Sequence, residues 1–501
     1  MKKNHKSIQI CGTGSGVGKS IIVAGLCRII LQDGYKVCPF KAQNMALNSF
    51  VTYEGGEIGR AQAVQAQASL LEPCVDMNPI LIKPTSNTGA QIIVYGKPIG
   101  NMTAREYHNY KIKAKKKVMS SFNRLKKKFD IIVIEGAGSP AEINLKAHDI
   151  VNMKMAEAAN APVILVGDID KGGVFAWLVG TLELLNKNER KRIKGFIINK
   201  FRGDKSLLKP GIDFLEKKTG IKVLGVVPYF KDIKIPEEDS VILENKKNIR
   251  KKNKMKVINI AVINLPRISN FTDFDALENE PDVNLYYVNT KDDLANPDVI
   301  IIPGTKNTIK DLQWLKNSKI ADKIRLILRL NHLSVLIGIC GGYQMLGMKI
   351  CDSHNVESKC KEIEGLGFLP MITNFEIEKT LCQVKAKEIS SNHMVTGYEI
   401  HHGRTEHIKK CAPLLKIIER QGKKNSDFDG TIIDNGKIWG TYLHGIFDEN
   451  NFRRNFLNKL RISKGLSGVS QSTILNRDRE FDKLADLLRQ NIDMNLLYSI
   501  I

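Results

Sequence analysis

The segment that most restricts the fold is a glycine-rich run between a predicted strand and a predicted helix. It follows the apolar run Ile8–Ile10 and precedes the helical run Ile21–Ile30, and it comprises Gly12, Thr13, Gly14, Ser15, Gly16, Val17, Gly18, Lys19 and Ser20. Glycines let the backbone turn its N–H groups toward phosphate oxygens, and the helix N-terminus adds a positive dipole end. We therefore expect a P-loop, in which Lys19 reaches the outer phosphates and Ser20 binds Mg²⁺. The alternative, a chance glycine-rich turn, is disfavoured by the strand-to-helix setting.

The rest of the chain predicts two α/β domains, which suits a length of 501 residues. Apolar strand-like runs alternate with helical stretches up to residue 230, at 131–134, 163–166 and 196–198, and again from residue 257, at 257–262, 299–302 and 335–338. This pattern is typical of a doubly wound parallel sheet. We expect a P-loop domain over 1–243, a polar linker over 244–256 and a second α/β domain over 257–501. A C-terminal helix, with an apolar stripe of Phe481, Leu484, Leu487 and Leu488, is expected to pack on the second domain.

Two acidic residues end apolar strands in the first domain. Glu135 follows the run 131–134 and Asp168 follows Gly167. An open parallel sheet places its ligand crevice at these strand ends, and Mg²⁺ prefers oxygen ligands. Both carboxylates are therefore candidate Mg²⁺ ligands, although each could instead cap the next helix. Asn199, after the strand 196–198, is a candidate for reading the nucleotide base through its amide.

A cysteine occupies the turn between a strand and a helix in the second domain. Cys340 stands in Gly338-Ile339-Cys340-Gly341-Gly342, directly after the apolar run 335–338. Flanking glycines permit the tight turn that exposes a nucleophile, and the N-terminus of the following helix favours negative charge on its sulfur. A lone cysteine is more often an inert core residue, so the prediction of a nucleophile depends on its neighbours in the fold.

Two further segments supply what a cysteine nucleophile needs. The turn Pro303-Gly304-Thr305 follows the strand 299–302, and the backbone N–H groups of Gly304 and Gly341 are the predicted oxyanion donors. His444, in Tyr442-Leu443-His444-Gly445, ends a strand-like run and is the predicted general base. A packed or surface histidine is the alternative for this position.

Composition excludes several classes of protein. No apolar run is long enough to cross a bilayer, and the start of the chain has no room for a signal peptide, so we expect a cytoplasmic protein without a membrane partner. The nine cysteines lack paired spacing, which argues against disulfides and structural zinc. The net charge of +23 is spread over the whole chain without an aromatic-interleaved basic stripe, so we expect no nucleic-acid partner. The alternative is that this charge helps to gather anionic substrates.

Taken together, these motifs resemble the cobyric acid synthases, the glutamine-dependent amidotransferases of cobalamin biosynthesis. The resemblance covers nearly the full length of the chain. It includes the segments 25–28, 39–45, 57–62, 77–79, 168–176, 199–204, 303–308 and 397–401.

This resemblance implies a P-loop amidoligase domain followed by a class I glutamine amidotransferase-like domain. It implies ATP- and Mg²⁺-dependent amidation of the b, d, e and g carboxylates of adenosylcobyrinic acid a,c-diamide, with ammonia from glutamine. Each carboxylate would be phosphorylated at the P-loop, while Cys340 would form a glutamyl thioester and His444 would shuttle protons. By analogy, Lys41, Gln43, Asn44 and Asn48 face the nucleotide and the substrate carboxylate, and Glu57 is a further Mg²⁺ contact.

One position departs from the pattern of many related glutaminases. An acid commonly stands two residues after the histidine, but here that position is Ile446. This subfamily lacks the acid as well, so the question is which group orients His444. Glu399 is a candidate because it lies in the motif Gly397-Tyr398-Glu399.

Three rival functions share part of these motifs. A sister amidotransferase acts on the a and c carboxylates of cobyrinic acid, but the segments 40–48 and 168–173 favour the first family. The glutaminase partner of a peptidoglycan-amidating complex has no ATP-binding half, whereas this chain has Gly18-Lys19-Ser20. ParA/MinD-type partitioning ATPases carry an additional lysine early in the P-loop, and the run 13–17 has none.

Overall fold

The computed structural model describes residues 5–85, 88–230, 232–236, 257–470 and 476–501. The predicted linker, 244–256, lies outside these described residues. The chain forms two compact units. The first is drawn from Met1–Ala46, Glu57–Glu238 and Asn476–Ile501, and the second from Leu47–Gly56 and Asp239–Leu475. Each unit therefore contains a segment from the other half of the sequence.

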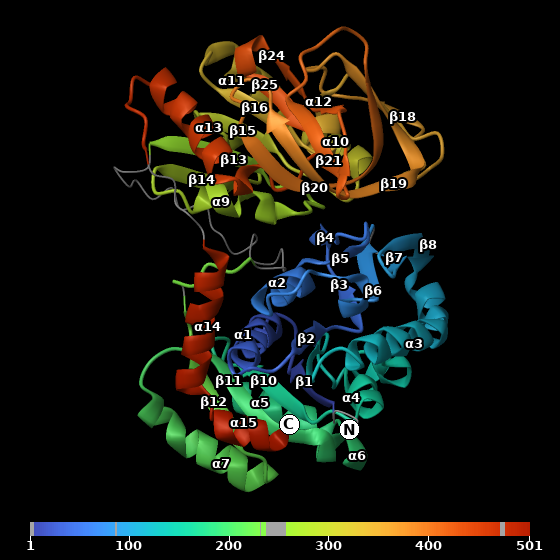
Figure 1. Cartoon of the computed structure of the whole chain (residues 1–501), viewed down its shortest axis with the longest axis vertical. Coiled ribbons are helices and arrows are strands. Elements are labelled where there is room, and N and C mark those ends of the chain that lie inside the picture. Colours follow the sequence, from blue (N-terminus) through green and yellow to red (C-terminus); the bar gives the residue numbers. More distant parts are fainter. Residues whose placement is uncertain (1–4, 86–87, 231, 237–256, 471–475) are drawn as a thin grey trace. The chain divides into compact units, whose positions relative to one another are not determined.

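A sheet of parallel strands forms the centre of the first unit (Figure 1). The order of its strands is β12-β11-β10-β1-β9-β2. The strands are β1 (Lys6–Gly12), β2 (Val37–Phe40), β9 (Ile131–Glu135), β10 (Val163–Asp168), β11 (Ile193–Phe201) and β12 (Val223–Pro228). Because the strand order reverses on either side of β1, the ligand crevice of this sheet type opens at the carboxyl ends of β1 and its neighbours. The predicted doubly wound sheet is confirmed.

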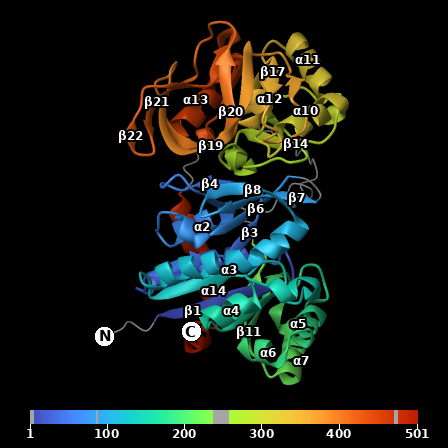
Figure 2. The same ribbon diagram turned by 90° about the vertical axis from the view of Figure 1, so that its right-hand side faces the viewer.

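Helices cover both faces of this sheet. They are α1 (Lys19–Gln32), α2 (Arg60–Ala68), α3 (Ala104–Lys126), α4 (Met153–Ala159), α5 (Val174–Glu183), α6 (Lys187–Arg192), α7 (Lys209–Thr219), α14 (Arg477–Asn491) and α15 (Met494–Ile500). Alternate strand residues point to opposite faces. Val133 packs in the cluster that contains α1 and α14, whereas Ile132 and Ile134 pack against α3, which Figure 2 shows along one side of the unit. The buried strands consequently read as continuous apolar runs.

The C-terminal helix corrects one expectation, because α14 packs in the first unit and not with the second domain. Its buried Leu484 and Leu488 lie against Gly25 of α1, where a Cβ atom would come within 2.3 Å of Leu488. Arg28 also donates to Asp482 at 2.7 Å. The apolar stripe was predicted correctly. A stripe shows only that one side of the helix is buried, however, and does not indicate which surface it packs against.

A smaller sheet completes the first unit, in the order β3-β6-β7-β8. Its strands are β3 (Gln43–Met45), β6 (Ile80–Pro84), β7 (Gly89–Val94) and β8 (Lys97–Thr103), and β5 (Glu57–Gly59) leads into α2. Thr103 caps α3 in a reciprocal capping box with Glu106.

The second unit has its own central sheet, in the order β14-β13-β15-β16-β25-β24. All neighbours are parallel except β24 and β25. The strands are β13 (Ile258–Ile263), β14 (Val283–Val288), β15 (Val299–Ile302), β16 (Val335–Ile339), β24 (Thr431–Ile433) and β25 (Ile438–Thr441). The helices are α9 (Asp275–Glu278), α10 (Thr308–Asn317), α11 (Ile320–Leu330), α12 (Gly341–Leu346) and α13 (Asn450–Ser463). The second α/β domain is confirmed.

A mostly antiparallel sheet lies beside this core in the same unit. It consists of β17 (Lys349–Cys351), β18 (Glu362–Glu364), β19 (Met371–Glu388), β20 (Met394–His407), β21 (Leu415–Arg420), β22 (Lys423–Lys424) and β23 (Phe428–Asp429). The short strand β4 (Ser49–Val51), from early in the sequence, belongs to this unit as well. Across the described ranges of both units, no helix has the length and apolar character needed to cross a membrane.

Candidate active sites

The predicted P-loop lies between β1 and α1, as expected. Gly18 has φ +97°, a left-handed conformation that glycine adopts freely, and a Cβ atom there would come within 2.1 Å of the Asn199 amide nitrogen. Lys19 Nζ donates to the carbonyl oxygens of Gly14 at 2.7 Å and Gly138 at 3.0 Å. The lysine ammonium therefore lies over the loop, where phosphate groups would meet it.

The ends of β10 and β11 support the loop from one side. Asn199 Nδ2 donates to Val17 O at 2.9 Å, and Lys200 Nζ donates to Gly16 O at 2.6 Å and to Asp168 Oδ2 at 2.9 Å. In the described part of the chain, Asn199 Oδ1 and Thr13 Oγ1 are buried without a hydrogen-bond partner. Buried polar atoms are rarely left unsatisfied, so these two atoms fit a ligand held in the loop.

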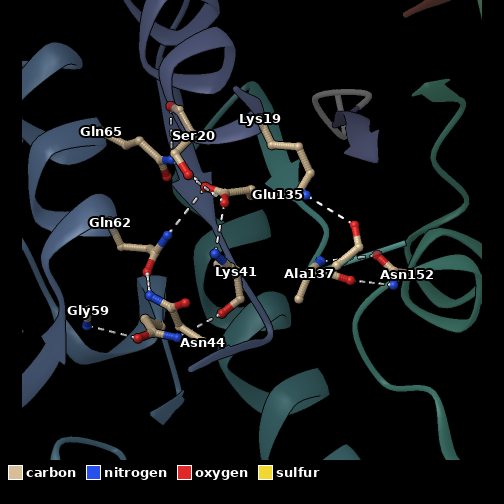
Figure 3. A network of polar contacts seen from close by, with 12 residues as sticks. Lys19, Ser20, Lys41, Asn44, Gly59, Gln62, Gln65, Glu135, Ala137 and Asn152 are labelled. Atoms are coloured by element: carbon tan, nitrogen blue, oxygen red, sulfur yellow. Dashed lines mark hydrogen bonds and ion pairs between the residues drawn. The ribbon is translucent and has the colours of Figure 1, made fainter. Parts of the chain in front are cut away.

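Glu135 is the centre of a polar network beside the loop (Figure 3). Its Oε1 accepts from Ser20 Oγ at 2.9 Å and from Lys41 Nζ at 2.7 Å, and its Oε2 accepts from Gln65 Nε2 at 2.5 Å. Burial works to raise the pKa of Glu135, but the Lys41 ammonium and the hydrogen bonds from Gln65 and Ser20 hold it below its usual value. The carboxylate is therefore ionised next to the Ser20 hydroxyl.

The network extends to some of the predicted substrate-binding residues. Gln62 Nε2 donates to Glu135 Oε2 at 3.4 Å, and Asn44 Nδ2 donates to Gln62 Oε1 at 2.9 Å (Figure 3). Gln43 is engaged elsewhere, because its Oε1 accepts from Tyr107 Oη at 2.6 Å. The structure thus links Lys41 and Asn44 to the P-loop through Glu135, and it adds Gln65, which sequence reasoning missed.

The predicted Mg²⁺ ligands do not form one cluster. Glu57 pairs with Lys83 at 2.7 Å, both side chains being buried, and Asp168 pairs with Lys200 at 2.9 Å. Among the described residues, no group of three or more His, Cys, Asp or Glu side chains is placed to hold a metal. Ser20 and Glu135 are the predicted ligands that contact each other.

In the second unit, Cys340 occupies a sharp turn between β16 and α12. Its backbone has φ +51° and ψ −107°, a conformation that is strained for a residue with a side chain. Such strain is typical of a nucleophile elbow, in which the turn directs the side chain out of the sheet. Cys340 Sγ lies 3.8 Å from Ile400 O, and the residue is 7% exposed.

His444 lies just beyond β25 and is within hydrogen-bonding reach of Cys340. Its Nδ1 lies 2.7 Å from Asp273 Oδ2, and the other oxygen of Asp273 accepts from Gly445 N at 3.1 Å. Burial works to lower the pKa of His444, but the Asp273 carboxylate and the Cys340 sulfur raise it to about 10. Because a carboxylate only accepts, the hydrogen between His444 and Asp273 must be on Nδ1. Nε2 is then the nitrogen that can exchange a proton with the Cys340 sulfur.

The two predicted oxyanion donors lie around this pair. A Cβ atom on Gly304 would come within 2.9 Å of His444 Cε1, and one on Gly341 would lie 3.2 Å from Thr305 N. Gly341 is also the first residue of α12, where N–H groups have no partner within the helix. The structure therefore brings Cys340, His444, Gly304 and Gly341 together, as the sequence predicted.

The group that orients His444, which the sequence left open with Glu399 as a candidate, is not Glu399. Glu399 accepts from Arg420 Nη2 at 2.9 Å and from Cys382 Sγ at 3.1 Å. The neighbouring Tyr398 stacks on His444, with ring centroids 5.3 Å apart, and successive side chains of a strand point to opposite faces. The acid that meets the histidine is Asp273, 171 positions away in sequence. Asp273 lies in the run Ser269-Asn270-Phe271-Thr272-Asp273, whose polar residues are all buried in the structure, but the sequence alone contained no sign of that burial.

Comparison with known proteins agrees with this two-part architecture. Residues 8–242 match the family model described as the CobQ/CobB/MinD/ParA nucleotide binding domain, and residues 259–452 match the CobB/CobQ-like glutamine amidotransferase domain. A cobyric acid synthase from Clostridium botulinum (strain Loch Maree / Type A3) is 53% identical over 99% of this chain and 99% of its own length.

The chain belongs to the cobyric acid synthase family.

Other cobyric acid synthases are similarly close. The one from Clostridium tetani (strain Massachusetts / E88) is 52% identical over 99% of this chain and 98% of its own length. The one from Thermoanaerobacter sp. (strain X514) is 51% identical over 98% of each chain. Membership of the cobyric acid synthase family thus rests on both halves of the chain, which also decides against a stand-alone glutaminase.

Proposed function

We propose that the chain amidates the b, d, e and g carboxylates of adenosylcobyrinic acid a,c-diamide, using ATP and glutamine. The observation that carries this proposal is the set of Cys340, His444 and Asp273 on the same chain as a P-loop. A cysteine–histidine–carboxylate set serves acyl transfer from glutamine, and a P-loop serves phosphoryl transfer. A chain with both can release ammonia and activate an acid to receive it.

In the glutaminase step, the Cys340 thiolate attacks the side-chain amide carbon of glutamine. The N–H groups of Gly304 and Gly341 donate to the oxyanion of the tetrahedral intermediate. His444 Nε2 then gives its proton to the leaving nitrogen, so that ammonia departs and a glutamyl thioester remains on Cys340. His444 then deprotonates a water molecule, which attacks the thioester and releases glutamate. This step regenerates the Cys340 thiolate and the protonated His444. Asp273 holds the imidazole in one orientation throughout.

In the synthetase step, a substrate carboxylate oxygen attacks the γ-phosphorus of ATP and ADP leaves. Lys19, over the loop, would neutralise the charge that develops on the phosphate oxygens, and Lys41 brings a second ammonium to Glu135 beside the loop. Ammonia then attacks the acyl phosphate, and phosphate leaves as the amide forms. Asn199 would bind the nucleotide through its buried Oδ1, while its nitrogen holds Val17.

The residues present fit a magnesium ion beside the P-loop. The Ser20 hydroxyl and the ionised Glu135 carboxylate contact each other, and both are hard oxygen donors. Ser20 and Glu135 would hold Mg²⁺ together with water and phosphate oxygens. When bound, the ion would neutralise charge on the phosphates and orient them. Glu57 and Asp168 remain weaker candidates because each is paired with a lysine.

Mass spectrometry of the corrinoid product tests the proposed function. Adenosylcobyrinic acid a,c-diamide is incubated with the chain, ATP, Mg²⁺ and glutamine. We expect four successive mass losses of about 1 Da, one for each carboxylate activated by phosphoryl transfer and then amidated. No change, together with amidation of cobyrinic acid itself, would instead identify the sister activity on the a and c carboxylates.

Asp273→Asn should impair the glutaminase without unfolding the site. An amide next to Nδ1 no longer fixes the imidazole orientation or stabilises the imidazolium, so we expect kcat for glutamine hydrolysis to fall by at least about 10²-fold, the lower end of what general acid–base catalysis contributes. Glutamate release measured over a range of glutamine concentrations checks this value. Glu399→Gln is the matched control, because Glu399 contacts Arg420 and Cys382. An equal loss in both variants would contradict the assignment of Asp273.

A further inference from the structure

The side chain of Asn270 contacts the catalytic histidine at Nε2, the ring nitrogen that Asp273 does not meet. Asn270 Nδ2 lies 3.4 Å from His444 Nε2, and Asn270 Oδ1 accepts from Ser49 N at 2.9 Å. Asn270 is 2% exposed and has φ +55°, in the left-handed region where asparagine is among the tolerated residues. Its amide is therefore held between the histidine ring and a backbone group from residue 49.

The contact with Ser49 fixes the direction of the Asn270 amide. A backbone N–H can only donate, so the atom that faces Ser49 must be the amide oxygen. The amide nitrogen then faces Nε2 of His444, the nitrogen that serves Cys340. It can donate to Nε2 in the neutral imidazole, the form that His444 takes once its proton has passed to the leaving nitrogen. An N–H in this place limits how the ring can turn, because Asp273 already holds the opposite nitrogen. Contacts at both ring nitrogens, together with the stacked Tyr398 ring, restrict the orientation of the imidazole.

Ser49 belongs to a segment, residues 47–56, which is seated in the second unit by several contacts. Asn48 Oδ1 accepts from Phe271 N at 3.3 Å, and Tyr398 Oη donates to Ser49 O at 3.2 Å. Val51 is fully buried with Tyr398 and Ile400, and Gln383 Nε2 donates to Val51 O. The Tyr398 ring also stacks on His444. Ser49 is therefore connected to the histidine through both Asn270 and Tyr398.

The segment is continuous at both ends with the nucleotide-binding unit. Three residues before it, Asn44 joins the Glu135 network through Gln62, and directly after it Glu57 pairs with Lys83. Residues 47–56 are thus bounded on both sides in sequence by residues of the nucleotide-binding unit. The histidine of the glutaminase is therefore oriented by residues that the other half of the sequence supplies.

We propose that Asn270 is a positioning residue for His444, and that residues 47–56 hold it in place. The inference rests on the proposed function and assigns the glutaminase a dependence on a segment from the synthetase half of the chain. Asn270 acts through the imidazole and touches neither glutamine nor the corrinoid in this role.

Two substitutions at residue 270 separate positioning from a purely structural role. Asn270→Gly removes the amide at a backbone angle that glycine tolerates. Asn270→Asp keeps an oxygen for Ser49 N but replaces the donor that faces His444. We expect both to lower kcat for glutamine-dependent amidation by about tenfold, the effect of one lost hydrogen bond, with KM for glutamine nearly unchanged. Amidation with free ammonium should remain at the level of the unmodified chain.

The segment is tested by Asn48→Ala, alone and combined with Asn270→Gly. Because Asn48 acts through the turn that contains Asn270, we expect the double variant to be no slower than Asn270→Gly alone. Tyr53→Phe, at an exposed position of the same segment, is the control and should leave every rate unchanged.

Several results would overturn the inference. Full activity of Asn270→Asp would show that only the contact with Ser49 matters, and additive losses in the double variant would show that the segment acts elsewhere. A loss of ammonium-dependent amidation equal to the glutamine-dependent loss would indicate a general structural defect. Glutamate release by the unmodified chain is measured first, because its absence would refute the proposed glutaminase itself and not merely the role of Asn270.

Discussion

Cys340→Ala is expected to abolish glutamine-dependent amidation while amidation with free ammonium continues. The sulfur is the atom that forms the glutamyl thioester, and alanine offers no nucleophile at the strained turn between β16 and α12. We expect the glutamine-dependent rate to fall by at least ~10⁴-fold, in line with the removal of a nucleophile from a catalytic set. Parallel assays with glutamine and with ammonium chloride, each followed by mass spectrometry of the corrinoid, measure the two rates.

Cys351→Ala is the matched control for this experiment, because Cys351 lies in β17 of the same unit and is partly exposed. It should retain both activities. If a folded Cys340→Ala protein lost the ammonium-dependent activity as well, the separation of ammonia production from carboxylate activation would be wrong.

Lys19→Met is expected to have the complementary effect and to stop amidation from either nitrogen source. The substitution keeps most of the side-chain length but removes the ammonium that lies over the loop at 2.7 Å from Gly14 O. Without that charge on the phosphates, we expect the amidation rate to fall by about 10³-fold. Glutamate release from glutamine should persist, since Cys340 and His444 lie in the other unit.

Lys36→Met is the control, since Lys36 is an exposed lysine that follows α1 in the same unit. It should leave ATP consumption and amidation unchanged. Sustained ammonium-dependent amidation by Lys19→Met would argue against the P-loop as the site of carboxylate activation.

The sequence predicted the parts of the fold and the sites that depend on short-range signals. The apolar runs became β1, β9, β10 and β11 because each buried strand of a parallel sheet needs apolar residues on both faces. The P-loop and the Cys340 turn were predicted because a glycine-rich turn between a strand and a helix has few alternative conformations.

What the sequence could not predict depends on which surfaces meet. Asp273 contacts His444 although the two residues are 171 positions apart in sequence, and the residues around Asp273 give no indication that its partner is this histidine. Asn48 was expected, with Lys41, Gln43 and Asn44, to face the nucleotide and the substrate carboxylate, yet it accepts from Phe271 N in the second unit. Helix α14 shows the same limit, because its apolar stripe fits either domain until the surface of α1 is known.

The position of α14 has a consequence for how the chain folds. Arg28 and Asp482, which contact each other in the first unit, are 454 positions apart in sequence. During synthesis, domains generally fold as their residues leave the ribosome, from the N-terminus onward. The first unit must wait for its last helix, however, so the second unit has all of its own residues available sooner. The nucleotide-binding half, although it is translated first, is therefore the half whose core closes last, and the part of α1 that α14 covers stays uncovered until residues 477–491 have been made.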